Sequence, residues 1–286
     1  RRCSDRDTPR DIAISMGLAG AARDTVDSDA IPAFGADVGQ RQRLPMAGGT
    51  HEVDFPREGG MTFRSDNLPL HENGLILTAW QDDMCLMKKT YYSVGGGFII
   101  EEAQFGQPVL DEVEVPYPFN TARELLESCH RTGQSVSGLV LKNELALHSR
   151  SEIEDYFSTV WQTMQACIDR GLNTEGVLPG PLRVPRRAAS LRRLLVSGSQ
   201  HSIDPMNVID WVNMFALAVN EENAVGGRVV IAPTNGACGI IPAVITYYHQ
   251  IVSPVSQEVA LRYFFASGAF GILYKMNVPI SEIGSA

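Results

Sequence analysis

A short run of small and polar residues, Thr234-Asn235-Gly236-Ala237-Cys238-Gly239, constrains this chain more than any other feature. It lies between an apolar, β-branched stretch, 228–233, and a second apolar stretch, 240–248, that is long enough for a helix. A glycine-containing turn at the start of a helix leaves backbone N–H groups unpaired, and these groups attract a carboxylate or a phosphate. The pattern therefore predicts a binding turn made of Thr234, Asn235, Gly236, Ala237, Cys238 and Gly239. The alternative is a plain helix start with a buried cysteine.

The five cysteines are scattered, and none is part of a CxxC pair or a zinc-like Cys/His spacing. We therefore expect free thiols in a reducing, cytoplasmic environment and no metal site within the chain. Cys238 is placed beside a helix N-terminus, where a thiolate would be stabilised. Cys167 falls on the apolar face of a long predicted helix and is expected to be a core thiol. Cys3, Cys85 and Cys129 carry no partner signal.

The charge and hydropathy of the 286 residues exclude two broad classes of partner. The net charge is −9 and the pI is about 5.2, which argues against a nucleic-acid surface. An uninterrupted apolar run of about 18 residues is absent, which argues against a membrane span. One group of arginines could bind an anion, although a solvated or ion-paired helix face is the preferred interpretation. The group is Arg183, Arg186, Arg187, Arg192 and Arg193.

The pattern of the chain changes at the proline pair Pro116-Tyr117-Pro118. Before it, two apolar runs, 75–80 and 84–93, flank Gln81-Asp82-Asp83 and predict a β-hairpin. After it, apolar residues recur with helical spacing. We therefore predict an α+β fold, with an α/β domain over 1–117 and a mostly α-helical domain over 118–286. The expected helices are 11–20, 121–133, 151–170, 186–196, 206–223, 239–251 and 257–276.

Other polar residues allow both a chemical and a structural interpretation. His51 and His71 lie in polar turns, where they could act as an acid or a base or could only hydrogen-bond the turn. Asn213 and Asn220 share one face of an apolar helix, which fits a buried network or a substrate-lining face. The triglycine 95–97 could hold the phosphate of pyridoxal phosphate, but none of the four lysines has a setting typical of a Schiff base.

Taken together, several stretches resemble the iron–sulfur-dependent L-serine dehydratases (L-serine ammonia-lyases) of bacteria, of the single-chain type. The resemblance runs in order from Asp11 to about Ile283. The stretches are His51-Glu52-Val53-Asp54-Phe55-Pro56, Asn67-Leu68-Pro69-Leu70-His71-Glu72-Asn73-Gly74, Lys89-Thr90-Tyr91-Tyr92-Ser93 with the following glycines, Asn143-Glu144-Leu145-Ala146-Leu147-His148-Ser149, Gly176-Val177-Leu178-Pro179-Gly180-Pro181-Leu182, Asn220-Glu221-Glu222-Asn223 and 232–239.

The resemblance implies a lyase of amino-acid degradation and gluconeogenesis that converts L-serine to pyruvate and ammonia. It also implies a [4Fe–4S] cluster with one open iron site, which acts as a Lewis acid on the serine hydroxyl while a base removes the α-proton. On this interpretation the amides around 234–239 hold the serine carboxylate. Neither the base nor any other catalytic residue is assigned. A homo-oligomer and activity on threonine both stay open.

The chain also departs from the family pattern at its ends. It begins at Arg1 and stops at Gly284-Ser285-Ala286, and the cluster cysteines of the family lie beyond the equivalent of Ile283. We therefore expect a fragment, truncated at both ends, that assembles no cluster and is inactive alone. Its last helix should expose apolar residues, namely Phe264, Phe265, Phe270 and Leu273. The alternative function is a non-catalytic remnant that binds an amino acid or associates with a partner subunit.

Overall fold

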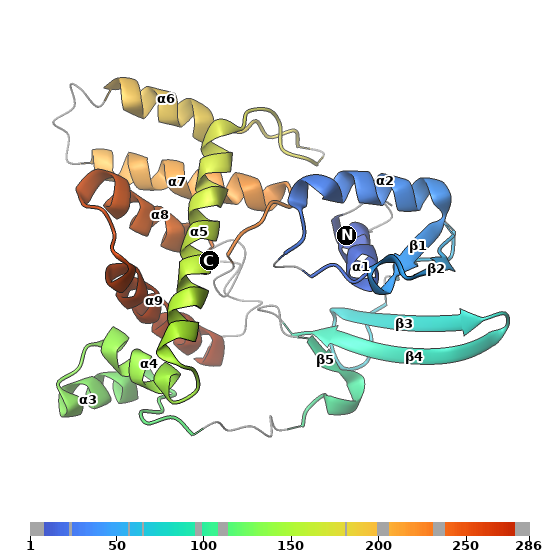
Figure 1. Ribbon diagram of the computed structural model, residues 1–286, viewed down its shortest axis with the longest axis horizontal. Coiled ribbons are helices and arrows are strands. Elements are labelled where there is room, and N and C mark those ends of the chain that lie inside the picture. Colours follow the sequence, from blue (N-terminus) through green and yellow to red (C-terminus); the bar gives the residue numbers. More distant parts are fainter. Residues whose placement is uncertain are drawn as a thin grey trace. The chain divides into compact units, whose positions relative to one another are not determined.

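The computed structural model describes residues 9–22, 25–56, 58–64, 66–94, 99–107, 114–180, 182–198, 206–230 and 238–277. The chain forms two compact units, Arg1–Tyr92 and Ser93–Ala286. Small antiparallel sheets in the first unit and a helical assembly in the second confirm the predicted α+β class (Figure 1). The domain boundary predicted between residues 117 and 118 stays a prediction.

The first unit combines short helices with two antiparallel strand pairs. Leu44, in the first pair, is only 1% exposed and is the largest fully buried aliphatic side chain of this unit among the described residues. Arg41, at the end of the preceding helix, and Arg43, in the first strand, both pair with Glu52 in the second strand. The Arg41 guanidinium holds the pKa of the Glu52 carboxyl below its usual range. The elements are α1 (Pro9–Leu18), η1 (Ser28–Ala30), α2 (Ile31–Arg41), β1 (Arg43–Met46), η2 (Ala47–Gly49), β2 (His51–Asp54), β3 (Gly74–Gln81) and β4 (Met84–Ser93).

The predicted β-hairpin is confirmed. Strands β3 and β4 pair antiparallel with Gln81 opposite Met84, so that Asp82 and Asp83 form the two-residue turn. Asp82 has a φ of +50°, a left-handed conformation that aspartate tolerates better than most residues. The hairpin extends as a long ribbon in Figure 1.

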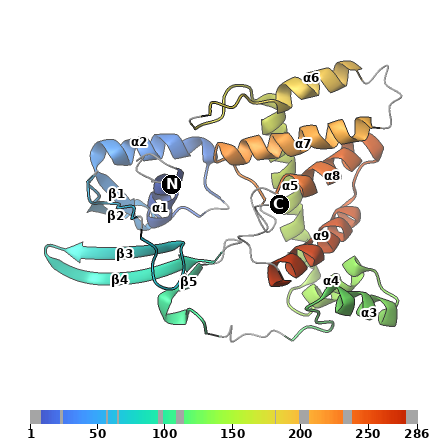
Figure 2. The ribbon, with the colours of Figure 1, turned by 180° about the vertical axis from the view of Figure 1, so that it is seen from behind.

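The second unit is mostly helical. The helix α5 is the longest, and in both ribbon views it runs across α7 (Figures 1 and 2). Three apolar clusters hold the unit together, and α5 contributes buried residues or neighbours to each of them. The elements are β5 (Ile99–Glu101), η3 (Glu102–Gln104), α3 (Ala122–Thr132), α4 (Val136–Leu145), α5 (Arg150–Asn173), α6 (Ala188–Gly198), α7 (Asn207–Ala224), α8 (Ile240–Tyr247), the π-helical turn η4 (Tyr248–Val252) and α9 (Gln257–Asn277).

Helix starts follow the capping residues in the sequence. The Thr121 hydroxyl accepts a hydrogen bond from the Glu124 N–H at 3.2 Å, and α3 ends at Gly133 with a φ of +65°. The Ser149 hydroxyl and the Glu152 carboxylate form a complete capping box at the start of α5. These local signals explain why the α3 and α5 starts lie where the sequence predicts them.

Two expectations about the helices were wrong. Gly171 does not end α5, because α7 crosses there so closely that an added Cβ would lie 2.4 Å from the Ala218 carbonyl oxygen. The last helix also buries more than expected: Phe264, Phe265 and Leu273 are buried against α4, α5 and α8, and only Phe270 is exposed.

Candidate functional site

The predicted binding turn lies only partly within the described residues. Thr234, Asn235, Gly236 and Ala237 lie outside them, whereas Cys238 and Gly239 come directly before α8. Gly239 packs so closely on α7 that an added Cβ would lie 2.9 Å from the Ala216 carbonyl oxygen. The end of the turn is therefore fixed to α7, and no described side chain caps the N-terminus of α8.

Cys238 is fully buried in an apolar cluster formed by α5, α6, α7 and α8. Burial raises the pKa of its thiol above the usual range. The stabilised thiolate expected from the sequence is therefore wrong, because removal from water outweighs the proximity of the helix N-terminus. Cys238 instead has the properties of the alternative interpretation, a buried cysteine at a helix start.

Cys167 lies in the same cluster, as predicted for a core thiol. Burial raises its pKa to about 12, and the negative charge of Glu222 adds to the effect. Both buried thiols are therefore protonated at neutral pH. A protonated thiol is a poor nucleophile and a poor metal ligand.

Two adjacent carboxylates, Glu221 and Glu222, are buried at the end of α7. Glu221 caps α6 from a distance: its carboxylate accepts the backbone N–H groups of Arg187 at 2.6 Å and Ala188 at 3.3 Å. Glu222 accepts a hydrogen bond from Arg186 Nη1 at 2.8 Å. The acidic pair therefore forms a structural network that joins α7 to the start of α6, and it needs no ligand to be satisfied.

The asparagines predicted to share the α7 face have different environments. Asn213 is exposed and Asn220 is half-buried.

In the arginine group, Arg186 pairs with Glu222 and Arg193 pairs with Glu175, as the ion-paired interpretation predicts. Arg192 donates to the Asn173 side-chain oxygen at 2.8 Å.

The two candidate histidines both lie in the first unit. His51 begins strand β2, so the turn predicted there was wrong. His71 lies in an irregular segment, and its Nδ1 accepts a hydrogen bond from the Asn73 N–H at 3.1 Å, which is the turn-stabilising role. The triglycine 95–97 lies outside the described residues.

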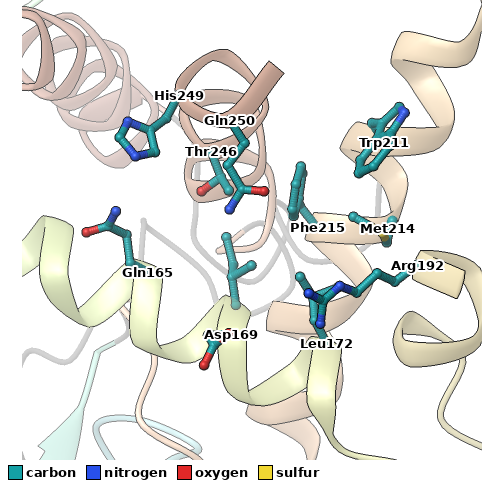
Figure 3. Close-up of a pocket in the computed structure, with 11 residues that line it drawn as sticks. Gln165, Asp169, Leu172, Arg192, Trp211, Met214, Phe215, Thr246, His249 and Gln250 are labelled. Atoms are coloured by element: carbon teal, nitrogen blue, oxygen red, sulfur yellow. The ribbon is translucent and has the colours of Figure 1, made fainter. Parts of the chain in front are cut away.

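A cavity of about 240 Å³ lies between α5, α6, α7 and the α8–η4 segment (Figure 3). Its lining includes apolar residues on α5 and α7, Arg192 of the predicted arginine group, and further polar side chains that were not predicted to form a site. One signal was present in the sequence: Thr246 and His249 interrupt an otherwise apolar run. The lining residues are Gln165, Ile168, Asp169, Leu172, Arg192, Trp211, Met214, Phe215, Thr246, His249 and Gln250.

The described residues do not fit an iron–sulfur cluster. Such a cluster is held by several cysteine thiolates at one place. Here Cys85 is on β4 of the first unit, Cys129 is on α3, and Cys167 and Cys238 are buried thiols without a third cysteine. Within the described ranges, moreover, no group of three or more His, Cys, Asp and Glu side chains could hold a metal ion.

Comparison with known proteins identifies the family of this chain. The serine dehydratase alpha chain family matches residues 131–284, and the serine dehydratase beta chain family matches residues 5–104. The chain belongs to the serine dehydratase family. The alpha-chain match covers the helices α4 to α9, and it includes Cys238, the acidic pair Glu221 and Glu222, and the cavity.

The relatives of this serine dehydratase chain carry consistent names. It is 65% identical to L-serine dehydratase 1 of Escherichia coli (strain K12) over 96% of this chain and 61% of the relative. It is 53% identical to the L-serine dehydratase of Haemophilus influenzae, again over 96% of this chain and 61% of the relative. The Streptomyces coelicolor L-serine dehydratase is 42% identical over 98% of this chain and 63% of the relative. The chain thus spans about three fifths of the length of these relatives. In the part that the structure describes, no helix is long and apolar enough for a membrane span.

Proposed function

We propose that this chain serves in the dehydration of L-serine to pyruvate and ammonia, a lyase reaction. One observation carries the proposal: both serine dehydratase families match this one chain. The beta chain family matches residues 5–104, and the alpha chain family matches residues 131–284. Relatives named L-serine dehydratase, up to 65% identical, support it. Roles in amino-acid degradation and gluconeogenesis, a cytoplasmic location and assembly as a homo-oligomer belong to the same proposal.

The substrate carboxylate, in this proposal, is bound by the backbone amides of 234–239. Two observations support this assignment. Cys238 is buried and Gly239 packs closely on α7, so the end of the segment is anchored, and the first turn of α8 has no side-chain cap. Uncapped N–H groups at a helix start and the helix dipole both favour a bound carboxylate. The glycines allow a ligand to approach the backbone, and Thr234 and Asn235 offer further hydrogen bonds.

Calorimetric titration of the chain with L-serine tests this substrate site. We expect binding that Asn235→Ala weakens at least about tenfold, the effect of losing roughly 1.4 kcal/mol. Asn213→Ala is the matched control, because Asn213 is exposed on α7. Equal affinities for the two variants, or no binding of L-serine by the unchanged chain, would overturn the assignment.

We also propose that this chain alone assembles no [4Fe–4S] cluster. The burial of Cys167 and Cys238 as protonated thiols, in a cluster that contains no third cysteine among the described residues, supports this. Anaerobic reconstitution with iron and sulfide, followed by metal analysis and a pyruvate assay with L-serine, provides the test. Stoichiometric iron and sulfide would refute the cluster proposal, and pyruvate formation would at the same time establish the dehydratase activity in this chain.

A further inference from the structure

Thr246, one of the residues that line the cavity between α5, α6, α7 and the α8–η4 segment, has an unsatisfied side-chain hydroxyl. The Thr246 side chain is 2% exposed, and its hydroxyl makes no hydrogen bond within the described part of the chain. A buried hydroxyl without a partner destabilises a fold, and such groups are rare in native structures. Because Thr246 lines the cavity, a molecule inside it is the natural partner.

The backbone beside Thr246 is also unusual. The helix α8 continues into the π-helical turn η4, which carries His249 and Gln250. Single π turns are rare, and they occur frequently at functional sites because they redirect side chains. Here both lining residues of the turn lie close to Thr246 (Figure 3).

Hydrogen-bond donors gather at this end of the cavity. His249 Nδ1 accepts the Val255 N–H at 3.0 Å, so the neutral imidazole carries its proton on Nε2 and donates there. Gln165 on α5 and Gln250 on η4 add amide donors, and Figure 3 shows them with Thr246 and His249 on one side. Such a group of donors suits the oxygen atoms of a carboxylate.

The other side of the cavity is mostly apolar. Met214 and Phe215 are buried, Trp211 is half-buried beside them, and Ile168 and Leu172 complete the surface from α5. Arg192 lines the same side, and its guanidinium donates a hydrogen bond to the uncharged side chain of Asn173 at 2.8 Å. The guanidinium therefore adds positive potential, while the Asp169 oxygens point away from the other sticks in Figure 3.

We propose that this cavity is a binding site for a small monocarboxylate with a short apolar tail. The carboxylate would accept hydrogen bonds from Thr246 and His249, and the tail would lie against Phe215 and Met214. A volume of about 240 Å³ is below the range of roughly 300–1,000 Å³ typical of drug-sized ligands, so it suits a small metabolite. The inference does not depend on the proposed function.

Titration of the intact chain with 3-methylbutanoate tests the proposal, with tryptophan fluorescence and calorimetry as readouts because Trp211 lines the cavity. We expect saturable binding that Thr246→Val weakens at least tenfold. Thr246→Val keeps the side-chain shape and removes only the unpaired hydroxyl, so the variant should fold as well as the original chain. Thr163→Val is the matched control, because Thr163 on α5 is not among the residues that line the cavity and its hydroxyl donates to the Thr159 carbonyl oxygen at 2.8 Å.

Three results would overturn the proposal. They are no binding at millimolar 3-methylbutanoate, equal binding by Thr246→Val and Thr163→Val, and equally tight binding of the uncharged 3-methylbutanamide. The last result would mean that the cavity binds apolar molecules and does not recognise the carboxylate. A circular dichroism melt of each variant shows that a lost affinity does not come from a lost fold.

Discussion

Nη1 of Arg186 lies 2.8 Å from Oε1 of Glu222, with the two side chains only 6% and 2% exposed. The Glu222 backbone oxygen also accepts the Gly227 N–H at 2.8 Å, at the point where the chain leaves α7. The pair therefore links the start of α6, the end of α7 and the segment that leads to residues 228–239. A charge pair in this position controls the local geometry more than it adds net stability, since desolvation offsets much of the attraction.

Removing one member of this pair should be strongly destabilising. Arg186→Met leaves the Glu222 carboxylate buried without its closest cation, and the nearest remaining ion-pair atom recorded among the described residues is Arg170 Nε at 3.8 Å. We expect urea unfolding to show a loss of about 3 kcal/mol. Arg193→Met is the control, because its pair with Glu175 is exposed on both sides and should contribute less than about 1 kcal/mol.

The double variant distinguishes a buried charge from lost packing. With Glu222→Leu added to Arg186→Met, no uncompensated charge remains, and we expect much of the lost stability to return. A double variant that is as unstable as the two single changes combined would contradict this explanation.

Two glycines in helices should respond to alanine in opposite directions. Gly171→Ala places a methyl group 2.4 Å from the Ala218 carbonyl oxygen, so α5 and α7 must separate. We expect a thermal melt of this variant to shift downward by several degrees, or no folding at all. At Gly268 in α9 an added Cβ has nothing within 4 Å, and Gly268→Ala should stabilise the chain by roughly 0.5–1 kcal/mol. A similar response of the two variants would show that α5 and α7 pack less closely than the structure indicates.

The sequence predicts those parts of the fold that depend on local patterns. The β3–β4 hairpin follows from two apolar runs around Asp82, and the start of α3 follows from Thr121, because both depend on neighbouring residues. The end of α5 could not be predicted from neighbouring residues. Gly171 is a typical helix terminator in the sequence, but the crossing of α7, distant in the chain, makes it an internal packing residue.

The candidate site shows the same limit. Cys238 was correctly placed beside a helix start, but its protonation depends on burial among α5, α6 and α7, which no local pattern reports. The unsatisfied hydroxyl of Thr246 is likewise a property of the assembled helices. In contrast, the resemblance to serine dehydratases could be identified from the sequence because many stretches match in order, and the family comparison confirms it.

The buried thiols lead to a prediction about pH. An unfolded cysteine titrates near about 8.5, whereas the folded Cys167 titrates at about 12. Between these values the unfolded chain has lost a proton that the folded chain keeps, so the free energy of unfolding falls as pH rises from about 8.5 toward 12. Below that window the thiol is protonated in both states and contributes no pH dependence.

Urea unfolding of the original chain and of Cys167→Ala at several pH values isolates this effect. The decline between pH 9 and 11 should be shallower in the variant by approximately one bound proton, while Tyr263, whose pKa burial also raises to about 12, contributes equally to both chains.

The protonation of the buried thiols also predicts how fast each cysteine is labelled. At pH 8 a thiol-reactive maleimide should modify the exposed Cys85 rapidly and should reach Cys167 and Cys238 only when the chain unfolds. Rapid labelling of Cys238 in the folded chain would mean that its thiol is accessible and ionised, and would restore the thiolate that its sequence position suggested.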